Sequence, residues 1–135
     1  MAFEIGERER EGIKILDLQG RLTVGAAASH LRDWVTRLHG EGTNQVILNL
    51  ADVDYIDSTG LGTLVICFTT LQKAGGGLRL LNLNKRNLEL LVLTKLSTVF
   101  QLFKDEQDAV NSFFPNREIK KFDILEFVKQ EDKES

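Results

Sequence analysis

Apolar residues in the first forty positions follow two periods, first that of a strand and then that of a helix. Apolar and polar residues alternate from Phe3 to Glu9, and a denser apolar run from Ile13 to Leu18 follows the polar segment Glu11-Gly12. Two such segments around a turn predict a β-hairpin. Farther along, apolar residues recur three and four positions apart, which predicts a helix from about Ala26 to His39 that glycines end.

A strong strand signal, Val46 to Leu50, leads into a strong helix signal. The run is apolar and rich in β-branched residues, which is typical of a strand buried on both faces. Apolar residues at helical spacing come after it: Leu61, Leu64, Val65, Phe68 and Leu71. The segment Asp57-Ser58-Thr59-Gly60 is therefore a strand-to-helix turn, and either Asp57 or Ser58 is predicted to cap the helix.

The alternation of strand and helix signals continues to residue 113. A glycine-rich turn ends the helix, and leucines from Leu78 to Leu83 predict a fourth strand. A short helix around Leu88 to Val92, a last strand from Val99 to Phe103 and a helix capped by Asp105 follow. Because a helix between two strands implies a parallel pair, residues 1–113 are predicted to form an α/β domain, a mixed β-sheet with helices packed mainly on one side.

Residues 114–135 break this alternation and form a C-terminal extension. Pro115 stands after the last predicted helix, and beyond it Phe122, Leu125 and Val128 share one helical stripe among charged residues. We predict a helix that packs on the domain, with a swapped or dimerising segment, and hence a homo-oligomer, as the alternative. The final residues, 130–135, are predicted to fray.

Composition narrows the functional classes. The chain has 135 residues, 42% of them hydrophobic, and a formal net charge of −3 with acidic and basic residues interspersed. One domain with its own core fits this length, and the absence of a basic face argues against nucleic acid as a partner. The sequence shows neither a signal peptide nor an apolar stretch of about 20 residues, so we expect a cytoplasmic protein with no membrane contact.

No metal or cofactor site is predicted. The chain's single cysteine excludes an intramolecular disulfide and a cysteine cluster, and His30 and His39 lack a second ligand at metal spacing. Asp52, Asp54 and Asp57 cluster before the turn and could bind a divalent cation. Shaping the turn and capping the helix is the preferred interpretation of these carboxylates.

Ser58 is the residue on which the functional hypotheses rest. Its hydroxyl is predicted at a helix N-terminus, where free N–H groups and the helix dipole favour negative charge, so Ser58 is either a phosphoacceptor or only a cap. We expect no enzyme activity. The Gly-x-Ser-x-Gly elbow is absent, because Ile56 stands two residues before Ser58, and both histidines precede the strand.

A partner-binding surface is expected on the outward stripe of the same helix. The residues on this stripe have small side chains apart from Ile66, which forms an apolar knob. The predicted partner-binding residues are Asp57, Thr59, Gly60, Gly62, Thr63, Ile66 and Thr70. A phosphate on Ser58 would add roughly two negative charges beside this surface and would block an acidic or apolar partner.

The segment Asp57-Ser58-Thr59-Gly60-Leu61-Gly62 after an apolar strand resembles the motif of bacterial STAS domains, in particular the anti-sigma factor antagonists. The resemblance covers about Phe3 to Phe113 and extends to the order of strands and helices. It implies that a partner serine kinase phosphorylates Ser58, with Thr59 as the other candidate acceptor. It also implies that the unphosphorylated form captures that kinase, which otherwise holds a sigma factor, and that a serine phosphatase resets the system.

Two positions depart from the usual pattern of that family. Thr23 stands where an Asp often follows Gly-x-Leu, and Asn49 replaces the Asp of Leu-Asp-Leu near the end of the strand. Because both acidic positions lie near the serine in the family, their loss makes the pocket less negative and leaves kinase specificity open. The alternative function is a STAS adaptor or scaffold subunit of a signalling assembly or transporter complex, which the C-terminal extension would suit.

Overall fold

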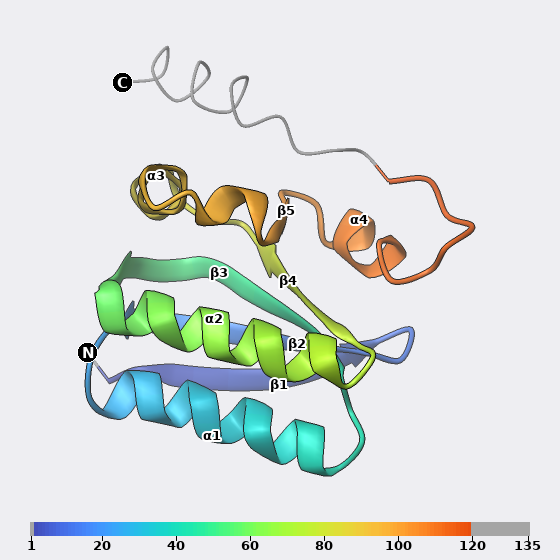
Figure 1. Ribbon diagram of the computed structural model, residues 1–135, viewed down its shortest axis with the longest axis horizontal. Helices are drawn as coiled ribbons and strands as arrows, with labels where there is room; N and C mark the ends of the chain where they lie inside the picture. Colours follow the sequence, from blue (N-terminus) through green and yellow to red (C-terminus); the bar gives the residue numbers. More distant parts are fainter. Residues whose placement is uncertain (1, 120–135) are drawn as a thin grey trace.

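The computed structural model describes residues 2–119, in which a five-stranded sheet carries four α-helices (Figure 1). The strands are β1 (Glu4–Arg10), β2 (Ile13–Leu22), β3 (Gln45–Ile56), β4 (Gly77–Leu81) and β5 (Gln101–Phe103). The helices are α1 (Ala26–Gly40), α2 (Ser58–Lys73), α3 (Lys85–Leu93) and α4 (Glu106–Asn111), with a 3-10 helix, η1 (Leu96–Thr98), before β5. The strands lie in sequence order; β1 and β2 are antiparallel and the other neighbours are parallel, which confirms the predicted mixed sheet.

The β1–β2 hairpin is set by its two turn residues. Glu11 and Gly12 have φ angles of 53° and 84°, the left-handed conformation that a type I′ hairpin turn requires at both central positions. The register follows directly, with Arg10 opposite Ile13 and Glu4 opposite Gln19. The predicted hairpin is confirmed.

Strand β3 is the centre of the sheet and is buried on both faces. Val46, Leu48 and Leu50 belong to a large apolar cluster shared with α1 and α2, while Ile47 belongs to a smaller cluster on the other face with α4. Since each face of this half of the strand meets a core, the apolar run needs no alternation. The prediction of a doubly buried central strand is confirmed.

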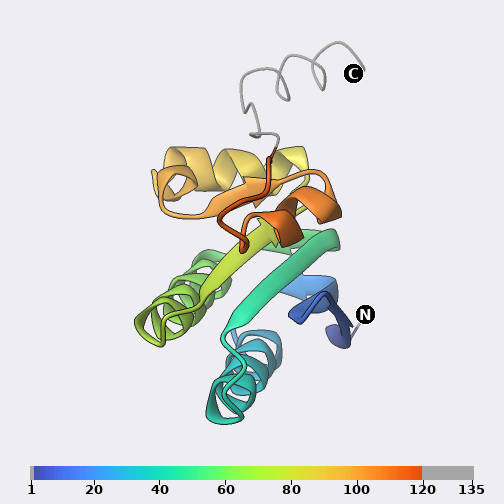
Figure 2. The ribbon, with the colours of Figure 1, turned by 90° about the vertical axis from the view of Figure 1, so that its right-hand side faces the viewer.

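Three helices cover one face of the sheet and α4 covers part of the other. The larger cluster takes Leu31 from α1, Leu64 from α2 and Leu88 from α3, and the smaller one takes Ala109 and Val110 from α4. Figures 1 and 2 show α1 and α2 lying side by side along the strands. The prediction of helices mainly on one side is confirmed.

Three strand boundaries differ from the prediction. β3 continues past Leu50 to Ile56, because its pairing with β2 extends to the partners Leu22 and Ile56 after the apolar run has ended. β4 stops at Leu81 instead of Leu83, because Asn82 adopts a left-handed φ of 61°. The last strand begins at Gln101, since the residues just before it form η1 and a turn.

The described part of the C-terminal extension ends at residue 119. Phe114 packs with Phe113 against the smaller apolar cluster, and the Arg117 guanidinium forms an ion pair with Glu11 at 2.9 Å. Packing against the domain therefore continues past the predicted boundary at 113. The predicted helix with Phe122, Leu125 and Val128 lies outside the described residues, as does the fraying end, and both stay predictions. Over residues 2–119, no helix is long and apolar enough to span a membrane.

Candidate functional site

Ser58 lies at the edge of the sheet where the parallel strands end. It is the first residue of α2, directly after the turn that follows the central strand β3, and both Ser58 and Thr59 are exposed. The loop between β2 and α1, residues 23–25, starts from the neighbouring strand at the same edge. Connections at the carboxyl ends of parallel strands are the usual location of binding sites in α/β sheets.

Asp57, and not Ser58, caps α2. One carboxylate oxygen of Asp57 accepts a hydrogen bond from the Gly60 N–H at 2.7 Å, and the other accepts one from the Val24 N–H at 2.9 Å. These backbone donors, Gly60 first and then Val24, lower the pKa of Asp57 below its ordinary value. The sequence left the cap open between two residues; the structure assigns it to Asp57 and leaves Ser58 exposed on the first turn.

Gly60 is a packing residue. It is buried, and a Cβ atom added there would lie 2.1 Å from the carbonyl oxygen of Leu22, the last residue of β2. The first turn of α2 therefore lies directly on the end of β2, and the Asp57 N–H donates to the same Leu22 oxygen at 3.2 Å. The prediction that Gly60 contacts a partner is corrected, because the residue faces the domain interior.

The outward face of α2 is shifted from the predicted one, because Thr69 is exposed and Thr63 is not. Gly62 and Ile66 are exposed and Thr70 is half-buried, but Thr63 is only 6% exposed, so its outward placement was wrong. The Thr63 hydroxyl donates to the Thr59 carbonyl at 3.1 Å, which satisfies its polar group inside the fold.

The buried arc of α2 is correspondingly rotated from the predicted one. Cys67, one turn after Thr63, is buried, whereas Val65 and Phe68 are only half-buried. The cause is that α2 packs against α1 as well as against β3 and β4, so its buried surface extends toward α1. Burial raises the pKa of the Cys67 thiol to about 12, so this thiol is protonated at neutral pH.

Val24 is an exposed residue of the site that the sequence did not single out. Val24 is 68% exposed although its N–H donates to the carboxylate of Asp57, the residue before Ser58. No local pattern distinguishes Val24 from other loop residues, because a hydrogen bond to a residue 33 positions away brings it to the site. Only the placement of both turns at one sheet edge could have indicated it.

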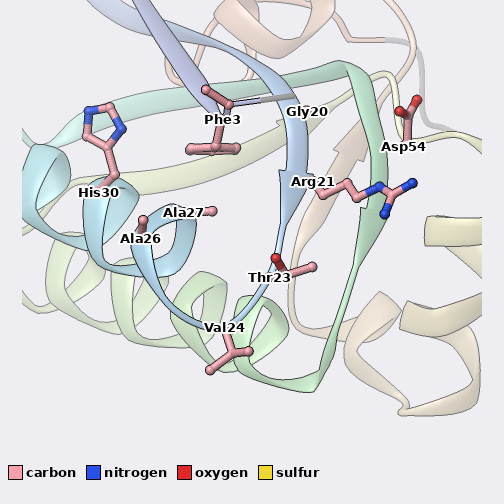
Figure 3. Close-up of a pocket in the computed structure, with 10 residues that line it drawn as sticks. Phe3, Gly20, Arg21, Thr23, Val24, Ala26, Ala27, His30 and Asp54 are labelled. Atoms are coloured by element: carbon pink, nitrogen blue, oxygen red, sulfur yellow. The ribbon is translucent and has the colours of Figure 1, made fainter.

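A hollow of about 650 Å³ lies beside this loop. Figure 3 shows Thr23 and Val24 on the loop, Arg21 on β2, His30 on α1 and Asp54 on β3 around it. The lining combines a guanidinium and an imidazole with a carboxylate, so it presents no single sign of charge to a ligand. Thr23 itself adds no charge to this lining.

The carboxylates before the turn do not form a metal site. Asp52 and Asp54 are exposed on the end of β3, while Asp57 is committed to two backbone N–H groups. Throughout residues 2–119, no group of three or more His, Cys, Asp or Glu side chains is arranged to hold a metal ion. His30 and His39 are both exposed on α1; His30 packs near Phe3, with ring centroids 6.1 Å apart.

Asn49 belongs to a polar row across three strands. Its amide nitrogen donates to Asp17 on β2 at 2.8 Å, and its oxygen accepts from Asn82 after β4 at 3.4 Å. The Arg8 guanidinium on β1 donates to both Asp17 oxygens, at 2.7 and 3.2 Å, and this contact is the largest cause of a lowered Asp17 pKa. An amide at position 49 therefore suits a neighbouring carboxylate, which an Asp would repel.

Asn49→Asp is expected to destabilise the fold at neutral pH by on the order of 1 kcal/mol, because it replaces an N–H donor to Asp17 with a second carboxylate. The loss in free energy of unfolding should become smaller as pH falls, because one of the two carboxylates then takes up a proton. Urea denaturation at pH 7 and near pH 4 measures it. Gln45→Glu, which adds the same charge at an exposed position of β3, is the control, and equal losses in both variants would contradict the expectation.

Comparison with known proteins agrees with this geometry. Residues 5–109 match the model of the STAS domain family. The anti-sigma-B factor antagonist of Bacillus subtilis (strain 168) is 31% identical over 110 residues, which cover 82% of this chain and 99% of that protein.

Solved structures show the same fold. An anti-sigma factor antagonist from Mycobacterium paratuberculosis matches 83% of this chain and 94% of its own, with a TM-score of 0.72 at 18% identity. The Bacillus cell fate determinant SpoIIAA in its phosphorylated form matches 82% and 98%, with a TM-score of 0.64 at 20% identity. With the family model covering most of the chain, the protein belongs to the STAS domain family, as its motif around Ser58 predicts.

Proposed function

We propose that this STAS protein is a phosphorylation-gated binding module that acts as an anti-sigma factor antagonist. Unphosphorylated, it captures a serine kinase that serves as an anti-sigma factor, and a sigma factor is thereby released. The kinase phosphorylates Ser58, which ends the capture, and a serine phosphatase restores the binding form. The name of the Bacillus subtilis relative supports the antagonist role, and the phosphorylated structure of SpoIIAA supports a phosphate switch.

The observation that carries the proposal is the division of roles between Asp57 and Ser58. Because Asp57 supplies the cap, the exposed Ser58 hydroxyl is not needed for the helix start. A kinase therefore has access to this hydroxyl without unfolding the turn. Thr59 is also exposed and is the competing acceptor.

Charge explains how a phosphate at Ser58 would act. It brings roughly two negative charges to the first turn of a helix, where the helix dipole favours them, so the fold is retained. A partner that docks over Ser58 would have to bury this dianion, and an acidic or apolar surface provides no compensation for its lost hydration. Binding is thus switched off while the domain stays folded.

The proposal is tested with a serine kinase anti-sigma factor from the same organism. After incubation with ATP, mass spectrometry should find one phosphate on the wild-type protein and on Thr59→Ala, and none on Ser58→Ala. Unphosphorylated protein should bind the kinase in calorimetric titration, and purified phosphoprotein should not. Phosphate on Thr59→Ala at a site other than Ser58, or equal binding of both forms, would refute the proposal and favour a scaffold function.

A further inference from the structure

Val24 and Ile66 are two exposed apolar residues close to the Ser58 turn, one on the loop that is hydrogen-bonded to Asp57 and one on α2. Val24 is 68% exposed and Ile66 is 43% exposed. Val24 lies on the loop that is hydrogen-bonded to Asp57, and Asp57 directly precedes Ser58 in the sequence. Ile66 lies two helical turns after Ser58 on α2. We propose that these two side chains are the apolar anchors of the partner-binding surface, and that Asp57 is the positioning residue that presents Val24.

This inference rests on the proposed function, because the protein that would bind this surface is the kinase that is captured while Ser58 is unphosphorylated. It adds two claims: that the surface comes from two segments far apart in the sequence, and that the partner's complementary face is apolar. Neither Thr23 nor Val24 carries charge, although this loop lies directly against the phosphoacceptor turn. This end of the surface therefore matches an apolar region on the partner better than a basic one.

The outer ridge of α2 between Ser58 and Ile66 is open. Gly62 lies one turn after Ser58 and one turn before Ile66, so the three residues form one i, i+4, i+8 ridge. No atom outside the local helix lies within 4 Å of a Cβ placed at Gly62. A partner can therefore approach the backbone of α2 between Ser58 and Ile66, and its apolar surface would then meet the position of a phosphate on Ser58.

Asp57 fixes the Val24 end of this surface through a single side chain. Its two carboxylate oxygens bind the Gly60 N–H and the Val24 N–H separately, so it joins the loop to the helix start. Gly25, the next loop residue, has a φ of 100° and ends the loop in a conformation that few other residues adopt. Without the Asp57 bond, the position of Val24 relative to Ser58 would depend on this loop alone.

The anchor test uses calorimetric titration of the unphosphorylated protein with the same kinase. Val24→Ser and Ile66→Ser are each expected to weaken binding by about tenfold or more, as truncation of an interface anchor does. Leu93→Ser is the matched control, since Leu93 is 82% exposed at the end of α3 and is more accessible than either anchor. It should change binding less than about twofold, because it lies outside the surface.

The positioning role is tested by hydrogen exchange of the Val24 amide, which needs no partner. In Asp57→Ser the shorter side chain can still cap α2 but cannot bind both N–H groups, so Val24 exchange should rise about tenfold while the helix is retained. Asp57→Asn keeps the side-chain length but has a single acceptor oxygen, so it too can accept from only one of the two N–H groups and should raise Val24 exchange if that oxygen stays on Gly60. Unchanged Val24 exchange in Asp57→Ser would refute the positioning role.

The outcomes separate this inference from the function on which it rests. If the wild-type protein does not bind the kinase, the proposed function fails, and the exchange experiment still decides the role of Asp57. If the wild type binds and both Val24→Ser and Ile66→Ser bind as tightly, the apolar anchors are refuted and the proposed function stands. Equal weakening in Leu93→Ser would also overturn the anchors, because it would show a general effect of exposed apolar residues.

Discussion

Gly60→Ala is expected to destabilise the domain by about 3 kcal/mol or more, a loss at the upper end of overpacking effects. The added Cβ would lie 2.1 Å from the Leu22 carbonyl oxygen and 2.9 Å from its carbonyl carbon, and both are backbone atoms that cannot rotate away. Relief requires α2 to move from the end of β2, which also breaks the bond from the Asp57 N–H to Leu22. Urea denaturation followed by circular dichroism measures the loss.

Gly62→Ala provides the control for this prediction. Gly62 lies in the same helix two residues later, and a Cβ there meets no atom within 4 Å outside the local helix. Alanine in an open helical position should stabilise the protein by up to about 1 kcal/mol relative to glycine. The two variants are therefore expected to change stability in opposite directions, and similar losses in both would contradict the close packing of α2 on β2.

Much of the fold was predictable because its signals are local. The turn at Glu11-Gly12 needs left-handed backbone, and the apolar run from Val46 to Leu50 needs a core on each face. Asp105 caps α4 through a 2.9 Å bond from the Asp108 N–H, within three residues of itself. Each of these features depends on neighbours in the sequence, so periodicity and turn chemistry identify them.

The features of the site that were mispredicted or missed depend instead on contacts between residues that are far apart in the sequence. The helical periodicity of the apolar residues predicted Thr63 on the outward face, but its hydroxyl is satisfied within the helix and the residue is buried where α2 packs against α1. Val24 reaches the site through a hydrogen bond from a distant carboxylate, and Asn49 pairs with Asp17 across two strands. Such contacts depend on strand order and register, which one sequence does not determine.

Ser58→Asp is expected to weaken binding to the kinase by at least about 100-fold while leaving the fold intact, because it places a fixed charge at the centre of the proposed surface. An aspartate on the first turn of α2 interacts favourably with the helix dipole, so the free energy of unfolding should change by less than about 1 kcal/mol. Ser58→Ala should bind regardless of incubation with ATP. It should cost little stability, because Asp57 and not Ser58 is the cap. Calorimetric titration and thermal melts of the purified variants measure both effects.

Thr59→Asp is the matched control for position, since it adds the same charge at the next exposed residue of the same turn. Residues one apart on a helix point about 100° from each other, so a surface centred on Ser58 should tolerate this variant better than Ser58→Asp. Equal weakening by both would indicate that only the net charge of the turn matters. Wild-type affinity in Ser58→Asp, together with wild-type affinity in the phosphoprotein, would show that Ser58 does not gate binding. An intact fold in Ser58→Asp is what separates a switch at the surface from a switch that works by unfolding, because an unfolded variant would also fail to bind.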